Sequence, residues 1–219
     1  MTEKPKLTIA LLRREAAAFA VLETNHAEPA LYGVTDGKAV GTYLEHKFRL
    51  LLRDKYDLLV GNSAKGIDFP DLDVDLKVTS IRQPQSSCPF RDARQKVYGL
   101  GYSLLILVYE KSDNPIAQVA TLKMLHTIFV DKSRTADYQT TRGIAEIFAR
   151  GGNRDDLVAY FQDRNLPVDE IGATLIAEEV LRSPPLQGYL TVSNALQWRL
   201  QYGRVIEVAG SVEGVQKEH

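Results

Sequence analysis

The chain has 219 residues, of which 44% are hydrophobic and 25% charged, so it is long enough to bury a sizeable core. Its 27 lysines and arginines nearly balance its 28 aspartates and glutamates, and this net charge of −1 excludes a polybasic, histone-like protein. The single cysteine, Cys88, excludes an internal disulfide. No apolar run approaches ~18 residues, and Arg13, Arg14 and Glu15 interrupt the N-terminal apolar patch early. We therefore expect a cytoplasmic protein without a membrane span.

The first part of the chain predicts two helices followed by a strand. An alanine-rich apolar pattern predicts a helix over residues 7–24. Asp36 is a suitable N-cap for a second helix that runs to about residue 56. From Leu72 to Val78 apolar and charged residues alternate strictly, which predicts a strand with one buried face and one charged face.

The rest of the chain predicts further strands and then helices. A polar loop over 81–92 and a short helix over 93–100 precede a buried strand over 103–111 and one or two strands over 117–130. Helices follow near 140–150, 153–164 and 168–182, then a strand over 188–192, a helix ending at Leu200, a strand over 204–208 and a frayed tail. The fold class is α/β, with a mixed central β-sheet flanked by helices. We expect a core over 1–130 and a mainly helical region over 131–219, either as two domains or as one compact unit.

The densest group of candidate catalytic residues lies in the segment GIDFPDLDVDLK, residues 66–77. Four aspartates fall within eight positions and a lysine follows them: Asp68, Asp71, Asp73, Asp75 and Lys77. Such a density of carboxylates points to a metal ion. A calcium loop starting at Asp71 is excluded, because Leu76 stands where glycine is required and Arg82 where the bidentate glutamate belongs.

A β-hairpin with a four-residue loop over 70–73 explains the pattern better. Phe69 then lies opposite Val74 on the core face, and Asp68 lies opposite Asp75 on the other face. Directly opposed residues have Cβ atoms about 4.5–5.5 Å apart. Two carboxylates at that distance repel each other unless a cation or a proton lies between them.

Lys77 follows Asp75 by two residues on the same strand, so both side chains point the same way. The hairpin therefore predicts one site formed by Asp68, Asp75 and Lys77. A register that differs by two residues would place Asp73 opposite Asp68, so Asp73 is the alternative ligand. The other interpretation of these charges is a solvated strand face that keeps a sheet edge soluble.

An acid at the end of one strand and an acid-x-Lys triplet on the next, here Asp68 and Asp75-Leu76-Lys77, resemble the signature of the PD-(D/E)XK nucleases, most closely type II restriction endonucleases. In that superfamily a glutamate on the preceding helix often joins the metal shell, and Glu45 fits this role unless it only pairs with Arg49 at the helix surface. The resemblance implies that Asp68, Asp75 and Glu45 hold Mg²⁺ and that these acids and Lys77 are catalytic.

The resemblance further implies a hydrolase of double-stranded DNA that acts as a homodimer on palindromic sites. One departure is that Ile67 stands where the eponymous proline is expected. A literal Pro70-Asp71 does occur, but in a continuous strand Asp71 would lie about 13 Å from Asp75. The alternatives are a repair or recombination nuclease of the same fold and a non-catalytic DNA-binding module.

The segment after the acidic strand is basic and polar, which favours DNA contacts. The predicted base-reading residues are Arg82, Gln83, Gln85, Ser86 and Ser87, and the predicted phosphate contacts are Arg91, Arg94 and Lys96. A competing set of contacts lies near the C-terminus, namely Trp198, Arg199, Gln201, Tyr202 and Arg204. Helix packing is the ordinary explanation for Trp198.

Overall fold

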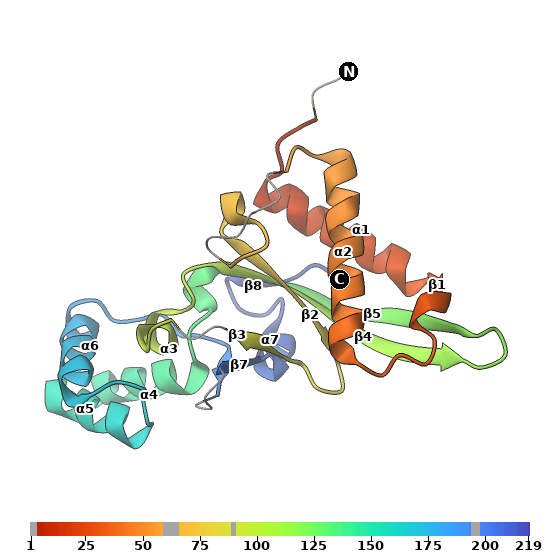
Figure 1. Ribbon diagram of the computed structural model, residues 1–219. Coiled ribbons are helices and arrows are strands. Elements are labelled where there is room, and N and C mark those ends of the chain that lie inside the picture. Colours follow the sequence, from red (N-terminus) through yellow and green to blue (C-terminus); the bar gives the residue numbers. More distant parts are fainter. Residues whose placement is uncertain (1–3, 59–65, 89–90, 194–197) are drawn as a thin grey trace. The chain divides into compact units, whose positions relative to one another are not determined.

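The computed structural model describes residues 4–58, 66–88, 91–193 and 198–219, and the chain forms two compact units (Figure 1). Unit 1 comprises residues 1–85, 103–130 and 208–219, and unit 2 comprises residues 86–102 and 131–207. The sequence places the division at residue 130. In the structure, the segment 86–102 joins the C-terminal region, and residues 208–219 return to the N-terminal one. None of the described helices is long and apolar enough to cross a membrane.

Unit 1 is built on a mixed five-stranded sheet, as the alternating and apolar segments predict. Its strands are β1 (Ala27–Glu28), β2 (Val74–Ser80), β4 (Ser103–Asn114), β5 (Val119–Val130) and β8 (Val215–Lys217). The order is β1-β5-β4-β2, with β8 also paired to β5. β2 runs parallel to β4, whereas the other pairings are antiparallel.

Two helices cover one face of this sheet (Figure 1), α1 (Ile9–Thr24) and α2 (Gly37–Lys55). The prediction that Asp36 caps α2 is confirmed, because its side chain accepts a hydrogen bond of 2.9 Å from the Lys38 backbone N–H. Phe19 of α1 and Phe48 of α2 pack with ring centroids 5.1 Å apart in the core. Burying each such side chain contributes about 1.5–3 kcal/mol. This packing holds α2 against α1, and α2 also contacts β2.

Unit 2 contains the helices expected after residue 131. These are α4 (Tyr138–Ala149), α5 (Arg154–Asp163) and α6 (Glu170–Arg182). The short helix α3 (Arg94–Tyr98), which comes earlier in the chain, also belongs to this unit. Asn153 and Asp156 form a reciprocal capping box at the start of α5. The apolar faces of the helices share one core that includes Ile144, Phe161 and Val180. A 3₁₀ turn, η3 (Lys132–Arg134), precedes α4.

The last part of the chain differs from its predicted elements. The polar segment 81–92 includes a short strand, β3 (Gln85–Cys88), and residues 89 and 90 lie outside the described part. The helix predicted to end at Leu200 is wrong, because Trp198–Gln201 is strand β7; residues 194–197 are not described. The strand predicted over 204–208 is also wrong, because Gly203–Val208 is helix α7. Such short apolar runs fit both the helical spacing of apolar residues and the alternation of a strand, so the local pattern does not decide between helix and strand.

Two further differences concern pairing. The strand predicted over 188–192 is shorter in the structure, where β6 comprises Thr191–Val192. It pairs with β7 in a three-stranded sheet of order β3-β7-β6. The tail is ordered rather than frayed, since β8 pairs with the end of β5 and brings Val215 opposite Val130. An ion pair of 2.6 Å between Arg13 and Glu218 fastens the tail to α1.

Candidate active site

The acidic segment forms the predicted hairpin. A 3₁₀ turn, η2 (Pro70–Leu72), and Asp73 with φ of 50° make the four-residue loop, so β2 begins at Val74 rather than at Leu72. The Phe69 backbone N–H donates to the Val74 carbonyl at 2.9 Å, and the Val74 N–H donates back at 3.2 Å. Phe69 therefore lies opposite Val74, which is the register that places Asp68 opposite Asp75. Asp73 completes the turn in the left-handed region instead of pairing with Asp68.

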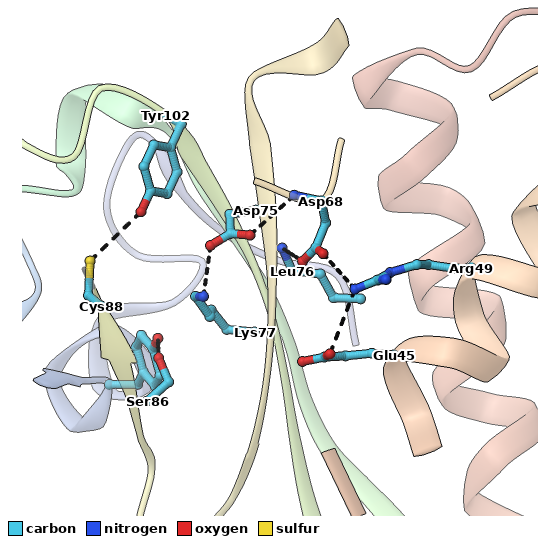
Figure 2. A network of polar contacts seen from close by, with 10 residues as sticks. Glu45, Arg49, Asp68, Asp75, Leu76, Lys77, Ser86, Cys88 and Tyr102 are labelled. Carbon is cyan, nitrogen blue, oxygen red and sulfur yellow. Dashed lines mark hydrogen bonds and ion pairs between the residues drawn. The ribbon is translucent and has the colours of Figure 1, made fainter. Parts of the chain in front are cut away.

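Asp68 and Asp75 lie side by side at the open end of this hairpin (Figure 2). The backbone N–H of Asp68 donates to Asp75 Oδ1 at 3.3 Å. The backbone N–H of Leu76 donates to Asp68 Oδ2 at 3.0 Å. Each carboxylate thus accepts a hydrogen bond from the backbone of the other strand, and these bonds hold the two acids as a pair.

Lys77 completes the predicted trio. Its Nζ lies 2.8 Å from Asp75 Oδ2. The expectation of an open charged face is corrected for Asp75, which is only 3% exposed. Burial raises the pKa of Asp75 to about 6, although the neighbouring Lys77 ammonium acts in the opposite direction. A buried carboxylate beside a second acid is an environment that favours an added cation.

Glu45 reaches the same site from α2, as Figure 2 shows. Arg49, one helical turn further on, lies between the two elements, with a guanidinium nitrogen 2.6 Å from Asp68 Oδ1 and 3.7 Å from Glu45 Oε2. The ion pair between Glu45 and Arg49, which the spacing of four residues predicts, is therefore present. Burial is the main cause that raises the pKa of Glu45, and the negative charge of Asp68 is the second cause. Glu45 therefore interacts electrostatically with the hairpin.

We use the term acidic site for Glu45, Asp68, Asp75 and Lys77. Within the described residues, no three acids, histidines or cysteines are already gathered closely enough to hold a metal ion. Arg49 neutralises Asp68 where an ion would bind. The donors are nonetheless carboxylate oxygens, the ligands that Mg²⁺ takes, and burial is the first cause of the raised pKa values of Asp75 and Glu45, with neighbouring acids adding to it. The residues therefore fit a magnesium site.

Arg49 contacts the acidic site through Glu45 and Asp68, and the sequence does not single it out as functional. The available signal was its spacing of four residues from Glu45, which puts both side chains on one face of the helix. Nothing local predicted that the same guanidinium would also reach the hairpin, because that contact joins residues 49 and 68.

Of the predicted DNA contacts that belong to unit 1, Arg82 and Gln83 lie in the turn after β2, and Gln85 begins β3. Arg82 and Gln83 are exposed there. The Thr79 hydroxyl holds the turn by accepting from the Gln85 backbone N–H at 3.0 Å and by donating to the Gln83 carbonyl at 3.2 Å. The side chains of Arg82 and Gln83 are thus presented on a braced turn.

The predicted contacts in unit 2 have more varied surroundings. Ser87 and Arg91 are exposed, whereas the Ser86 hydroxyl lies 2.5 Å from the Tyr202 hydroxyl. Arg94 is exposed and forms an ion pair with Glu179 of α6. Lys96 is buried, with 4% of its surface exposed, and burial lowers its pKa. This burial removes the exposure that the predicted phosphate contact of Lys96 requires.

The competing C-terminal set of predicted contacts also contains both buried and exposed residues. Trp198 and Tyr202 are buried, as ordinary packing predicts for Trp198, while Arg199 and Gln201 are exposed. The Arg204 guanidinium lies 3.7 Å from the centroid of the Tyr138 ring. Of the described members of this set, Arg199 and Gln201 are therefore the two that are presented to solvent.

Comparison with known proteins gives two matches. The family model of the type II restriction enzyme NspV matches residues 6–217. The type II restriction enzyme NspV of Nostoc sp. (strain ATCC 29411 / PCC 7524) is 66% identical over 209 residues, which are 95% of each chain. No solved structure matches the chain. The similarity covers the segments that form the acidic site and both units.

Proposed function

This chain belongs to the family of the type II restriction enzyme NspV, and on that premise we propose that it is a site-specific deoxyribonuclease that hydrolyses phosphodiester bonds in double-stranded DNA. The observation that carries the proposal is the identity of 66% over 95% of the chain. The pairing of Asp68 with Asp75 beside Lys77 supports it independently, because this is the arrangement of the PD-(D/E)XK signature. We assign the nuclease core of unit 1 to that superfamily.

We propose that Asp68, Asp75 and Glu45 hold Mg²⁺. Held by these carboxylates, such an ion would lower the pKa of a water and would stabilise the charge that develops on the phosphate. Asp75 is fixed for this role by the Asp68 backbone N–H and by Lys77. Glu45 approaches from the helix side, so the site is built from two elements that the core packs together.

Lys77 is proposed to orient the attacking water and to contact the scissile phosphate. Its ammonium is held 2.8 Å from Asp75, and its side chain is 19% exposed, so it remains within reach of a substrate. A fixed ammonium beside the reacting phosphate stabilises the transition state more than it stabilises the bound substrate.

The exposed residues Arg82, Gln83, Ser87, Arg91 and Arg94 are proposed to contact DNA, and Gln85 and Ser86 are proposed to position this segment. Cutting both strands of a palindromic site requires a twofold assembly, so we propose a homodimer on DNA. A protein–DNA complex that sediments with a single protein chain would contradict the dimer.

The function is tested with plasmid DNA and the purified protein. We expect discrete fragments when Mg²⁺ is added and intact plasmid when EDTA removes it. A smear would instead indicate a non-specific nuclease of the same fold. Plasmid that is bound but left intact in Mg²⁺ would indicate a DNA-binding module.

A separate prediction concerns Arg49. Replacing its guanidinium in Arg49→Gln removes a cation that lies 2.6 Å from Asp68, where it opposes a divalent ion. We expect the variant, free of DNA, to bind Ca²⁺ or Mg²⁺ about tenfold more tightly. Isothermal titration calorimetry measures this without any cleavage.

The control for Arg49 is Arg53→Gln, which makes the same charge change one turn further along α2 at an exposed position. Arg53→Gln should leave the affinity nearly unchanged. Equal or weaker ion binding by Arg49→Gln would show that Arg49 does not compete with a metal at Asp68.

A further inference from the structure

We propose that strand β7 reads the DNA sequence through Arg199 and Gln201, which act as specificity-determining residues. The inference rests on the proposed function, since it names the part of unit 2 that recognises the substrate. Both residues lie on one strand of the small sheet β3-β7-β6.

The sheet presents these two side chains together. β7 lies in the middle of the order β3-β7-β6. Its side chains alternate, with Trp198 and Leu200 buried and Arg199 and Gln201 exposed. Residues of one strand that are two apart share a face, so Arg199 and Gln201 are neighbours on the outer side.

The pairing with β6 extends this outer face. Thr191 lies opposite Gln201, and Val192 lies opposite Leu200. Val192 and Leu200 are both buried, so the register keeps one face apolar and the other polar. The outer face is therefore a polar surface, which we call the platform, over a buried apolar layer.

The charge of this platform suits DNA. None of the strands β3, β6 and β7 contains an acidic residue, and the sequence from 183 to 206 holds arginines but no aspartate or glutamate. Arg199 forms no ion pair within the described residues, in contrast to Arg94, Arg142 and Arg154 of the same unit. Its guanidinium is thus available to an acceptor outside the protein.

The chemistry of the pair matches base edges in the major groove. Arginine pairs with guanine O6 and N7, and glutamine pairs with adenine N6 and N7, each through two hydrogen bonds. The major groove also admits a β-ribbon. Two residues along a strand span about 6.8 Å, which is roughly two base-pair steps of 3.4 Å. Arg199 and Gln201 therefore have the spacing to contact nearby base pairs.

The test compares Arg199→Ala and Gln201→Ala with the wild-type enzyme on its own cleavage site and on sites that differ by one base pair. We expect each variant to lose about 10- to 100-fold in cleavage at the wild-type site, and to lose less at one near-cognate site. The preference for the wild-type site over that near-cognate site then falls. Arg150→Ala removes an exposed arginine elsewhere in unit 2 and should leave this preference unchanged.

Arg199→Lys serves as a second variant that keeps the charge and removes the two-pronged donor. It should retain the non-specific DNA affinity measured in Ca²⁺ but lose the preference for the wild-type site over the near-cognate site. An unchanged preference in Arg199→Ala and Gln201→Ala, or an equal loss at every site, would overturn the inference. Both results require a wild-type enzyme that cuts plasmid into discrete fragments, whereas failure of the proposed function would appear as a wild type that does not.

Discussion

Asp75→Asn is expected to reduce DNA cleavage by roughly 10³-fold or more, because it removes a charged ligand from the centre of the acidic site. The fold should survive, since asparagine has the same shape and its Oδ1 can still accept from the Asp68 backbone N–H. DNA binding should also persist, because repulsion between two acids is relieved as the ligand is lost. Single-turnover cleavage with Mg²⁺ and thermal unfolding of the same preparation measure the two effects.

Asp71→Asn provides the matched control for this experiment. Asp71 lies in the same hairpin but is exposed on the loop, so its variant should cut DNA at nearly the wild-type rate. Substantial cleavage by a folded Asp75→Asn protein would remove Asp75 from the metal site. It would leave this carboxylate with a structural role in the hairpin.

Lys77→Ala is expected to lower turnover by about 10²- to 10⁴-fold with little change in DNA affinity. The lysine is held against Asp75, so its loss removes a positioned ammonium rather than a diffuse surface charge. The rate of the bound complex should therefore fall while the dissociation constant, measured in Ca²⁺, stays close to that of the wild type.

Lys123→Ala, at an exposed position on β5, controls for the loss of one positive charge from unit 1. It should leave both the rate and the affinity nearly unchanged. A Lys77→Ala protein with near-normal turnover would separate the acid-x-Lys triplet from the chemistry. It would favour a structural ion pair between Lys77 and Asp75.

The geometry of the hairpin could be predicted because local rules determine it. Alternation fixes which side chains share a face, and a four-residue loop fixes the partner of each residue, so Asp68 was placed opposite Asp75 from the sequence. The burial of Asp75 could not be predicted in this way. Alternation separates two faces of a strand, but whether a face is covered depends on segments far away in the chain.

The errors near the C-terminus have the same origin. The run Trp198–Gln201 is too short for its pattern to distinguish a strand from the end of the predicted helix, and its pairing with β6 makes it a strand. A frayed tail is predicted beyond residue 209 because chain termini are often poorly ordered. In the structure, the tail's partner is β5, where Lys217 pairs with Ile128. Pairings across such sequence distances leave no local pattern.

The return of β8 to the first sheet bears on how the protein is made. Residues 208–219 belong to unit 1 although the whole of residues 131–207 separates them from β5. A nascent chain on the ribosome therefore exposes the edge of β5 at residues 128–130 until residues 215–217 have emerged. The sheet of unit 1 is therefore completed only after unit 2 has been synthesised, and a product truncated before residue 215 lacks the strand that covers that edge.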